Sequence, residues 1–261
     1  MADKSVFRFV AKDILKSKEK GKMLRIKGLT KKYGEKCAVD NLTLDIAPGE
    51  LCAFIGHNGA GKTTTLKACV GILSFDEGNI FINGISILDD PMFCKRSIAY
   101  IPDNPDLYDF LTGIGYLNFV ADVFGVDRKT REEKIRTLAD KFELTADLAT
   151  LIGEYSHGMK QKLAIIAAWL HSPRLILMDE PFVGLDPKAS FTLKEMMREH
   201  CKSGGSIFFS THVLDVAEKL CDKVAIIKGG RLVVSGEMEN VRGSESLEEV
   251  FLELEAEDED D

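Results

Sequence analysis

A glycine-rich loop between a buried strand and a helix is the feature that most constrains this chain. Residues 56–63 read GHNGAGKT and follow the apolar run 50–56, ELCAFIG, which is typical of a strand buried on both faces. Gly56, Gly59 and Gly61 permit a tight turn whose backbone N–H groups converge, and the positive end of the next helix points to the same place. Converging N–H groups at a helix N-terminus bind phosphate, so the sequence predicts a phosphate-binding loop.

The loop also carries the side chains that a nucleotide and its metal ion require. We expect Lys62 to reach the β- and γ-phosphates, the Thr63 hydroxyl to bind Mg²⁺, and Thr64 to face the phosphates. The nucleotide-binding residues predicted from the loop are Gly56, His57, Asn58, Gly59, Ala60, Gly61, Lys62, Thr63 and Thr64. A glycine-rich turn with a chance lysine is the alternative, and the strand and helix on either side count against it.

A second apolar strand ends in two carboxylates. In the segment 175–181, LILMDEP, apolar residues bring Asp179 to the end of a buried strand, where it can bind Mg²⁺ through water. Glu180 follows at once, and a carboxylate there can orient and polarise a water molecule for in-line attack on the γ-phosphate. Taken alone, this pair is typical of a surface turn or a helix cap. Beside the phosphate-binding loop it predicts nucleotide hydrolysis, and the lack of an N-K-x-D motif counts against a GTPase.

Short apolar runs with two different patterns indicate the fold. Residues 23–30 and 42–46 alternate with period two, as half-buried antiparallel strands do. Continuous apolar runs, typical of parallel strands, occupy 174–180, 206–210 and 223–228. With helical segments between them, these runs predict an α/β fold with a mostly parallel sheet, an antiparallel β subdomain and an α-helical subdomain. The phosphate-binding loop identifies the core as that of a P-loop NTPase.

Helical periodicity dominates the middle of the chain. One apolar stripe runs through 114–124, and a second runs through 135–142, after a capping box at Thr130 and Glu133. Residues from about 103 to 160 are nearly all helical in pattern, and we expect them to form a separate lobe.

Charge is concentrated at the two ends of the chain. Residues 1–22 hold seven Lys or Arg against three Asp or Glu; they are either a basic amphipathic helix on an anionic membrane or a partner, or a loosely attached extension. The last nine residues carry seven carboxylates, and the rest of the chain has 35 acidic and 34 basic residues, so we predict no nucleic-acid partner. The main domain is expected over 23–243, followed by a short helix and an acidic, disordered tail over 244–261.

The cysteines and the apolar segments bear on the compartment. No C-x-x-C pair occurs among the six cysteines, and their scattered spacing suits reduced cytosolic thiols better than disulfides or a zinc site. No run of about 18 or more apolar residues is present, and the basic N-terminus lacks the features of a secretory signal. A cytoplasmic protein is therefore expected.

Residues 154–162, EYSHGMKQK, complete a set of motifs in a fixed order. From about Met23 to about Gly236 the chain resembles the nucleotide-binding subunits of ABC transporters, and the resemblance implies their ABC ATPase architecture. The matching motifs are Tyr33, which would stack on adenine; the loop 56–64; Ser156 and Gly158 of the signature; Asp179 for Mg²⁺ and Glu180 for water; Asp186 of GLDP, the loop that crosses the dimer; and His212, which would contact the γ-phosphate. The resemblance thus implies Glu180 and His212 as catalytic residues, and ATP with Mg²⁺ as ligands.

The signature departs from the usual L-S-G-G-Q, because residues 155–159 read YSHGM. Ser156 retains the hydroxyl, Gly158 lets the backbone approach phosphate, and a helix over 159–170 supplies its dipole. The side chains of His157 and Met159 are expected to tune the contact without abolishing it. In the family, the signature of one subunit closes on ATP held by another, so a second nucleotide-binding subunit, identical or related, is an implied partner.

A second departure occurs after the strand 97–102, SIAYIP. At Asp103 the family carries a glutamine that touches the metal ion and the attacking water. Aspartate is shorter and charged, so it can still reach Mg²⁺ through water, or it can weaken coupling between the helical lobe and the site. A turn residue beside Pro102 and Pro105 is an equal alternative.

The resemblance also implies a membrane-spanning permease subunit that docks near residues 103–120. We expect Leu107–Leu111 to line part of its groove, although these residues could instead be the core of the lobe. The pattern looks most like export-type subunits. Docking on the permease would place the chain peripherally on the inner face of the cell membrane. The alternatives are a soluble ABC-family ATPase without a link to transport and a binding-only ATP clamp, which Asp103 and the altered signature slightly favour.

Overall fold

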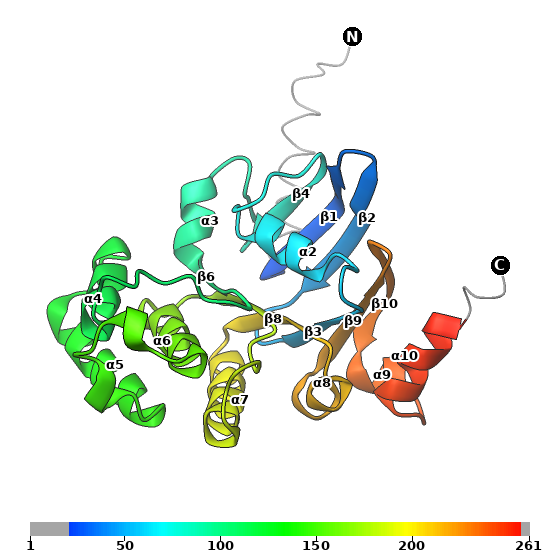
Figure 1. Cartoon of the computed structure of the whole chain (residues 1–261). Helices are drawn as coiled ribbons and strands as arrows, with labels where there is room; N and C mark the ends of the chain where they lie inside the picture. Colours follow the sequence, from blue (N-terminus) through cyan, green and yellow to red (C-terminus); the bar gives the residue numbers. More distant parts are fainter. Residues whose placement is uncertain (1–20, 257–261) are drawn as a thin grey trace, which may run out of the picture.

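Two sheets organise this α/β fold, which confirms the predicted fold class (Figure 1). The computed structural model describes residues 21–256. A four-stranded antiparallel sheet has the order β2-β1-β4-β5, and a six-stranded sheet has the order β10-β9-β3-β8-β7-β6. The antiparallel sheet consists of β1 (Leu24–Tyr33), β2 (Lys36–Ile46), β4 (Glu77–Ile82) and β5 (Ile85–Ser86). The larger sheet consists of β3 (Leu51–Ile55), β6 (Ile98–Ile101), β7 (Leu175–Asp179), β8 (Ser206–Thr211), β9 (Lys223–Lys228) and β10 (Arg231–Glu237).

The larger sheet brings distant parts of the chain to one edge. Its strands are parallel except β10, which pairs antiparallel with β9. The sequence does not predict β10, because its apolar run is short and ends in Ser-Gly. Ile55 of β3 pairs with Thr211 of β8, and Asp179 of β7 pairs with Ser210. The carboxyl ends of these strands therefore lie together, and ligands of open α/β sheets bind at such an edge.

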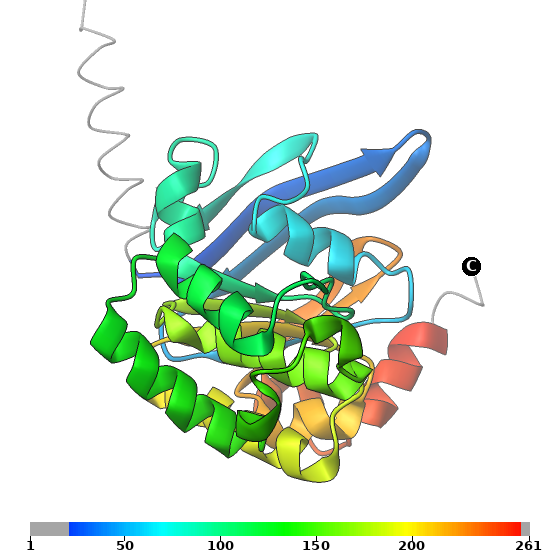
Figure 2. The same ribbon diagram turned by 60° about the vertical axis from the view of Figure 1, so that its left-hand side comes forward.

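Helices cover both faces of the larger sheet. They are α2 (Lys62–Cys69), α3 (Pro91–Ser97), α4 (Gly113–Val123), α5 (Arg128–Lys141), α6 (His157–Leu170), α7 (Pro187–Lys202), α8 (Leu214–Leu220), α9 (Met238–Arg242) and α10 (Leu247–Ala256). Helix α2 packs between the two sheets. Helices α4 and α5 lie beside α6 on the opposite side of the molecule from α10 (Figure 2).

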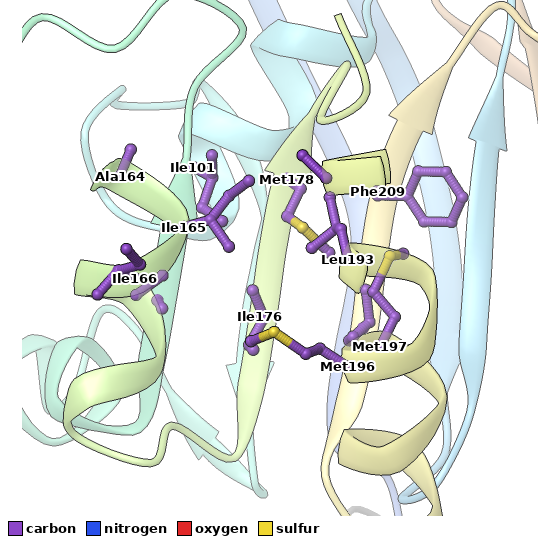
Figure 3. Packing of buried hydrophobic residues seen from close by; sticks show 14 of the residues in the cluster. Ile101, Ala164, Ile165, Ile166, Ile176, Met178, Leu193, Met196, Met197 and Phe209 are labelled. Atoms are coloured by element: carbon purple, nitrogen blue, oxygen red, sulfur yellow. The ribbon is translucent and has the colours of Figure 1, made fainter. Parts of the chain in front are cut away.

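Alternate residues of the central strands enter two separate cores. In β3, Leu51 and Ala53 face the core beneath α6 and α7, whereas Cys52 and Phe54 face the core beneath α2. Figure 3 shows the first core, in which side chains of α6 and α7 pack against β6, β7 and β8. Each fully buried Ile or Leu there stabilises the fold by about 1.5–3 kcal/mol. Burial on both faces explains why these strands read as continuous apolar runs in the sequence.

The helices differ from the prediction at their starts. Residues 102–112, the beginning of the expected lobe, contain no helix, because Pro102 and Pro105 lack the N–H groups that a helix interior needs. Helix α5 is capped by Asp127, whose carboxylate accepts a hydrogen bond from the Thr130 N–H at 3.0 Å, so the capping box expected at Thr130 and Glu133 is wrong.

A capping box does occur at the start of α10. The Ser246 N–H donates to the Glu249 carboxylate at 2.7 Å, and the Glu249 N–H donates to the Ser246 hydroxyl at 3.2 Å. Helix α10 extends to Ala256, so the first residues of the expected acidic tail are helical. The hypotheses about residues 1–20 and 257–261 lie outside the described residues. Of the helices described between residues 21 and 256, none combines the length and apolarity needed to cross a bilayer.

Candidate functional site

The phosphate-binding loop connects the end of β3 to the start of α2. Gly61 has a left-handed φ of 110°, and no side chain caps the helix that begins at Lys62, so its first N–H groups remain available to phosphate oxygens. A Cβ atom on Gly61 would lie 2.5 Å from the carbonyl oxygen of Ala38, and one on Gly56 would lie 2.4 Å from that of Ile227. Only glycine fits at these two positions, as the sequence predicts for a tight loop.

Lys62 is buried within the loop. Its Nζ donates hydrogen bonds to the carbonyl oxygens of Gly56 and His57, the latter at 3.1 Å. Burial lowers the pKa of Lys62, whereas the carboxylates of Glu180 and Asp179 act to raise it. Because the ammonium group lies in a partly buried site, its attraction for a phosphate exceeds that of a lysine in water.

Asp179 ends β7 with one carboxylate oxygen unsatisfied. Asp179 is 1% exposed, and its Oδ1 accepts a hydrogen bond from the Ser210 hydroxyl on the neighbouring strand. Its Oδ2 is buried and has no hydrogen-bond partner among the described residues. Buried polar atoms nearly always have partners, and a Mg²⁺ ion or its bound water fits this oxygen. The residues present therefore suit the metal ion that the sequence predicts.

Glu180 is held in an unusual backbone conformation next to His212. Its φ is 46°, in the left-handed region, and its N–H donates to the Ser210 hydroxyl at 3.0 Å. One oxygen of its carboxylate lies 3.0 Å from Nδ1 of His212, which follows β8. Non-glycine residues rarely adopt this φ, and such strain occurs preferentially at functional sites. Ser210 thus contacts the carboxylate of Asp179 and the backbone of Glu180, a role that no sequence pattern indicates.

A cavity of about 320 Å³ joins the loop to the two carboxylates. It is lined by Tyr33, Lys36, Ala38, His57, Asn58, Gly59, Gly61, Lys62, Thr63, Thr64, Asp103, Asp179 and Glu180. Tyr33 stands at the cavity with half of its surface exposed, and Lys31 Nζ lies 5.3 Å from the centre of its ring. Gly56 and Ala60 do not line the cavity, and neither do the predicted residues Ser156, Gly158, Asp186 and His212.

Asp103 lies in the loop after β6 and faces the same cavity as Asp179. The side chain of Tyr100, in β6, lies near the carboxylates of Asp179 and Asp103. Burial raises the pKa of Tyr100, and the charges of Asp179 and Asp103 act in the same direction. Four loops, after β3, β6, β7 and β8, therefore contribute polar groups to one edge of the sheet, as the parallel topology requires.

The signature turn forms a separate, exposed surface. Ser156 is the N-cap of α6, and its hydroxyl accepts a hydrogen bond from the Met159 N–H at 3.3 Å. A Cβ atom on Gly158 would lie 2.7 Å from the carbonyl oxygen of Gly184, and one on Gly184 would lie 2.4 Å from the ring of His157. The turn therefore packs directly against the GLDP loop.

Asp186 caps the next helix, α7, beside this turn. Its carboxylate accepts from the Ala189 N–H at 2.8 Å and pairs with Lys162 at 2.7 Å. The hydrogen bond from Lys162 holds the pKa of Asp186 below its usual value. Both loops thus present helix N-termini on a surface that does not border the cavity of their own chain.

A second cavity, of about 460 Å³, is lined by residues of α4, α6, β6 and the loop after β6, and lies beside a group of exposed aromatic residues. The Tyr108 ring lies 5.8 Å from that of Phe110 and 5.7 Å from that of Phe119, and Phe110 is 77% exposed. Leu107 and Tyr116 line the cavity and are partly buried. Only part of this segment is therefore lobe core, and a continuous apolar surface remains exposed.

Comparison with known proteins links this geometry to one family. The family described as ABC transporter matches residues 39–183. The ABC-type transporter ATP-binding protein EcsA of Bacillus subtilis (strain 168) is 35% identical over 241 residues, which cover 90% of this chain and 98% of that protein. The matched range contains the phosphate-binding loop, the signature turn and the two carboxylates, whereas Tyr33, Asp186 and His212 lie outside it.

Solved structures share the fold over most of the chain. One described as the ATP binding subunit of an ABC transporter is 37% identical, with a TM-score of 0.85, and covers 89% of this chain and 99% of that chain. A dimeric post-hydrolysis structure of the ATP-binding cassette MJ0796, bound to ADP and Pi, is 24% identical, with a TM-score of 0.74, over 83% of this chain and 99% of that chain. The latter similarity shows the fold alone.

Proposed function

The chain belongs to the ABC transporter family, as an ATP-binding subunit of a kind that hydrolyses ATP, and from this premise we propose that hydrolysis takes place in the 320 Å³ cavity. The observation that carries the proposal is that this cavity joins the phosphate-binding loop to Asp179 and Glu180. Adenine would stack on Tyr33, and the N–H groups at the start of α2 would hold the phosphates. Lys62, whose ammonium group has three donors, would keep its contact with the His57 carbonyl oxygen and turn its other donors to the β- and γ-phosphates.

The carboxylates would have two roles, metal binding and activation of the attacking water. Thr63, Asp179 and, through water, Asp103 would hold Mg²⁺, which neutralises charge on the β- and γ-phosphates. Glu180 would accept a proton from the attacking water, because its carboxylate faces the cavity and is fixed by its contact with His212. His212 would contact the γ-phosphate. The free oxygen of Asp179 supports the metal site, and the strained Glu180 backbone supports a catalytic role.

Steady-state phosphate release by the purified chain tests this proposal. Glu180→Gln is expected to lower kcat by about 10² or more, since it removes the base while keeping the shape of the side chain. Lys62→Ala is expected to weaken ATP affinity, and Lys67→Ala, on the same helix, serves as the matched control. ATP affinity that is equal in the Lys62→Ala variant and the wild type would show that the nucleotide lies elsewhere.

A second subunit would complete the site. The signature turn is exposed and does not border its own cavity, so Ser156 and Gly158 would contact ATP held by another copy or a related chain. The structure of MJ0796 is described as dimeric, which supports this arrangement. Gel filtration of Glu180→Gln with ATP and Mg²⁺ should show a dimer, and Ser156→Glu in the same background should abolish it by repelling the phosphates.

The exposed aromatic surface supports a separate permease partner and a peripheral, cytoplasmic position on the membrane. Phe110 and Tyr108 would contact the permease at the docking groove. We also propose that transport runs in the export direction. Co-purification with a protein of several membrane spans tests the contact. Phe110→Asp should weaken it, whereas Phe191→Asp, at a 65% exposed phenylalanine on α7, should not. A binding-only clamp is the second candidate, because Asp103 replaces the usual glutamine, and sustained phosphate release excludes it.

A further inference from the structure

The C-terminal helix α10 contacts the phosphate-binding loop. The ring of Phe251 packs against the ring of His57, with centroids 5.1 Å apart and planes inclined by 57°. These values lie within the range of favourable aromatic pairs. Phe251 is 9% exposed, so most of its ring is removed from water by this contact and by the core beneath it. The loop near the start of the chain is thus supported by a helix at its end.

His57 connects this contact to the nucleotide cavity. Its carbonyl oxygen accepts hydrogen bonds from Lys62 Nζ and from the Ala60 N–H, both at 3.1 Å, and the residue lines the cavity. Gly56 and Gly59 lie close on either side of His57 and have little intrinsic backbone preference. The position of the His57 backbone therefore depends on side-chain contacts, and the contact with Phe251 is one of them.

Helix α10 is held firmly enough to support the loop. A helix of ten residues is marginal by itself, so its position depends on tertiary contacts. At its start, the Leu247 N–H donates to the Glu218 carboxylate at 2.9 Å, and the Leu247 side chain is fully buried. At its end, Lys228 Nζ donates to the carbonyl oxygen of Leu254 at 2.8 Å, which places a cation at the negative end of the helix.

The same part of β9 supports both elements. Lys228 is the last residue of β9 and holds α10, and Gly230, two residues later, donates its N–H to the carbonyl oxygen of Ala60 at 3.0 Å. The end of β9 and the turn after it therefore contact both the loop and α10. The ring contact between Phe251 and His57 joins the same two elements directly. A shift of α10 would move the ring of His57 and, with it, the carbonyl group that holds Lys62.

We propose that Phe251 is a positioning residue of the nucleotide site: it fixes His57, and through the His57 carbonyl group it places Lys62 for the phosphates. This inference rests on the nucleotide site proposed above. Phe251→Leu keeps an apolar side chain but removes the ring, and it is expected to raise the Kd for ATP by about two- to tenfold. The kcat at saturating ATP should stay close to that of the wild type, because Phe251 does not touch the carboxylates.

A double-mutant cycle on the full-length chain tests the route through His57. The Kd for ATP with Mg²⁺ is measured by equilibrium titration for Phe251→Leu, His57→Ala and the double variant, at a temperature where circular dichroism shows each variant folded. The double variant should bind no more weakly than His57→Ala alone, since the two residues act through one contact. Phe251→Tyr, which keeps the ring, should restore affinity. Leu252→Ala, at a 60% exposed residue of the same helix, is the matched control and should equal the wild type.

Two results would overturn the inference. One is a wild-type Kd for folded Phe251→Leu, and the other is a full additional loss when Phe251→Leu is combined with His57→Ala. The Lys62→Ala variant distinguishes a failure of this inference from a failure of the proposed nucleotide site. If Lys62→Ala weakens binding and Phe251→Leu does not, only the role of Phe251 is wrong; if neither variant weakens it, the nucleotide does not bind in this cavity.

Discussion

Ser210→Ala removes one hydroxyl that contacts both acidic residues of the proposed site, Asp179 through its carboxylate and Glu180 through its backbone N–H. The Ser210 side chain donates to Asp179 Oδ1 and accepts from the Glu180 N–H at 3.0 Å, and the residue is fully buried. Alanine fits the same space, so the change deletes hydrogen bonds with little effect on packing. Asp179 would then have no partner for either oxygen among the described residues.

The expected loss follows from these two hydrogen bonds. A hydrogen bond to a charged group contributes about 1.5–3 kcal/mol, and one between neutral groups contributes about 0.5–1.5 kcal/mol. We therefore expect the free energy of unfolding to fall by about 2–4 kcal/mol, which corresponds to a melting temperature lower by about 5–15 °C. Since Asp179 and Glu180 lose their common support, kcat should fall by about tenfold or more.

Ser206→Ala is the matched control, because Ser206 is a fully buried serine of the same strand. Its hydroxyl donates to the carbonyl oxygen of Ala47 at 2.8 Å and touches neither carboxylate. Urea unfolding should show a loss of about 1 kcal/mol for this variant, with wild-type ATP turnover. If the two variants lose equal stability and hydrolyse ATP equally well, Ser210 is only another buried hydroxyl, and the reasoning about the carboxylates is refuted.

Three further changes test other parts of the site. Asp103→Gln should raise the rate of phosphate release, and an unchanged rate would identify Asp103 as a turn residue. Gly158→Ala, whose Cβ atom would lie 2.7 Å from the Gly184 carbonyl oxygen, should slow hydrolysis while the Kd of the isolated subunit for ATP stays the same. Because burial lowers the pKa of Lys62 below 10.5, the unfolded chain binds more protons than the folded chain between the two values, so stability should rise with pH in that alkaline window. Urea unfolding across that window should show the rise in the wild type and a flatter curve in Lys62→Met.

Features that arise within a short segment could be predicted from the sequence. The phosphate-binding loop follows from the spacing of its glycines and from Gly61, whose left-handed φ favours glycine, and the adjacent strand reveals itself by burial on both faces. The start of α7 follows in the same way, because Asp186 and Pro187 form a local cap. Each of these signals depends on residues a few positions apart.

The sequence pattern does not reveal features that depend on contacts between residues far apart along the chain. Ser210 has no distinctive sequence pattern, and its role exists only because β8 pairs in register with β7. The contact between Phe251 and His57 likewise joins two ends of the chain. The misplaced capping box at Thr130 has a local cause: Asp127 offers an equally good cap one turn earlier, and periodicity alone does not choose between them.

The two surfaces of the proposed site are not independent within one chain. Gln161, on α6 just after the signature turn, is buried and donates to the carbonyl oxygen of Pro181 at 3.3 Å. Pro181 directly follows Glu180, whose left-handed backbone leaves it little freedom to absorb a displacement. A contact that moves the signature turn therefore acts, through α6 and this hydrogen bond, on the backbone that carries the chain's own carboxylate. Binding of a partner's nucleotide at one surface would then alter the geometry of Glu180 at the other, which is the physical requirement for two coupled hydrolysis sites.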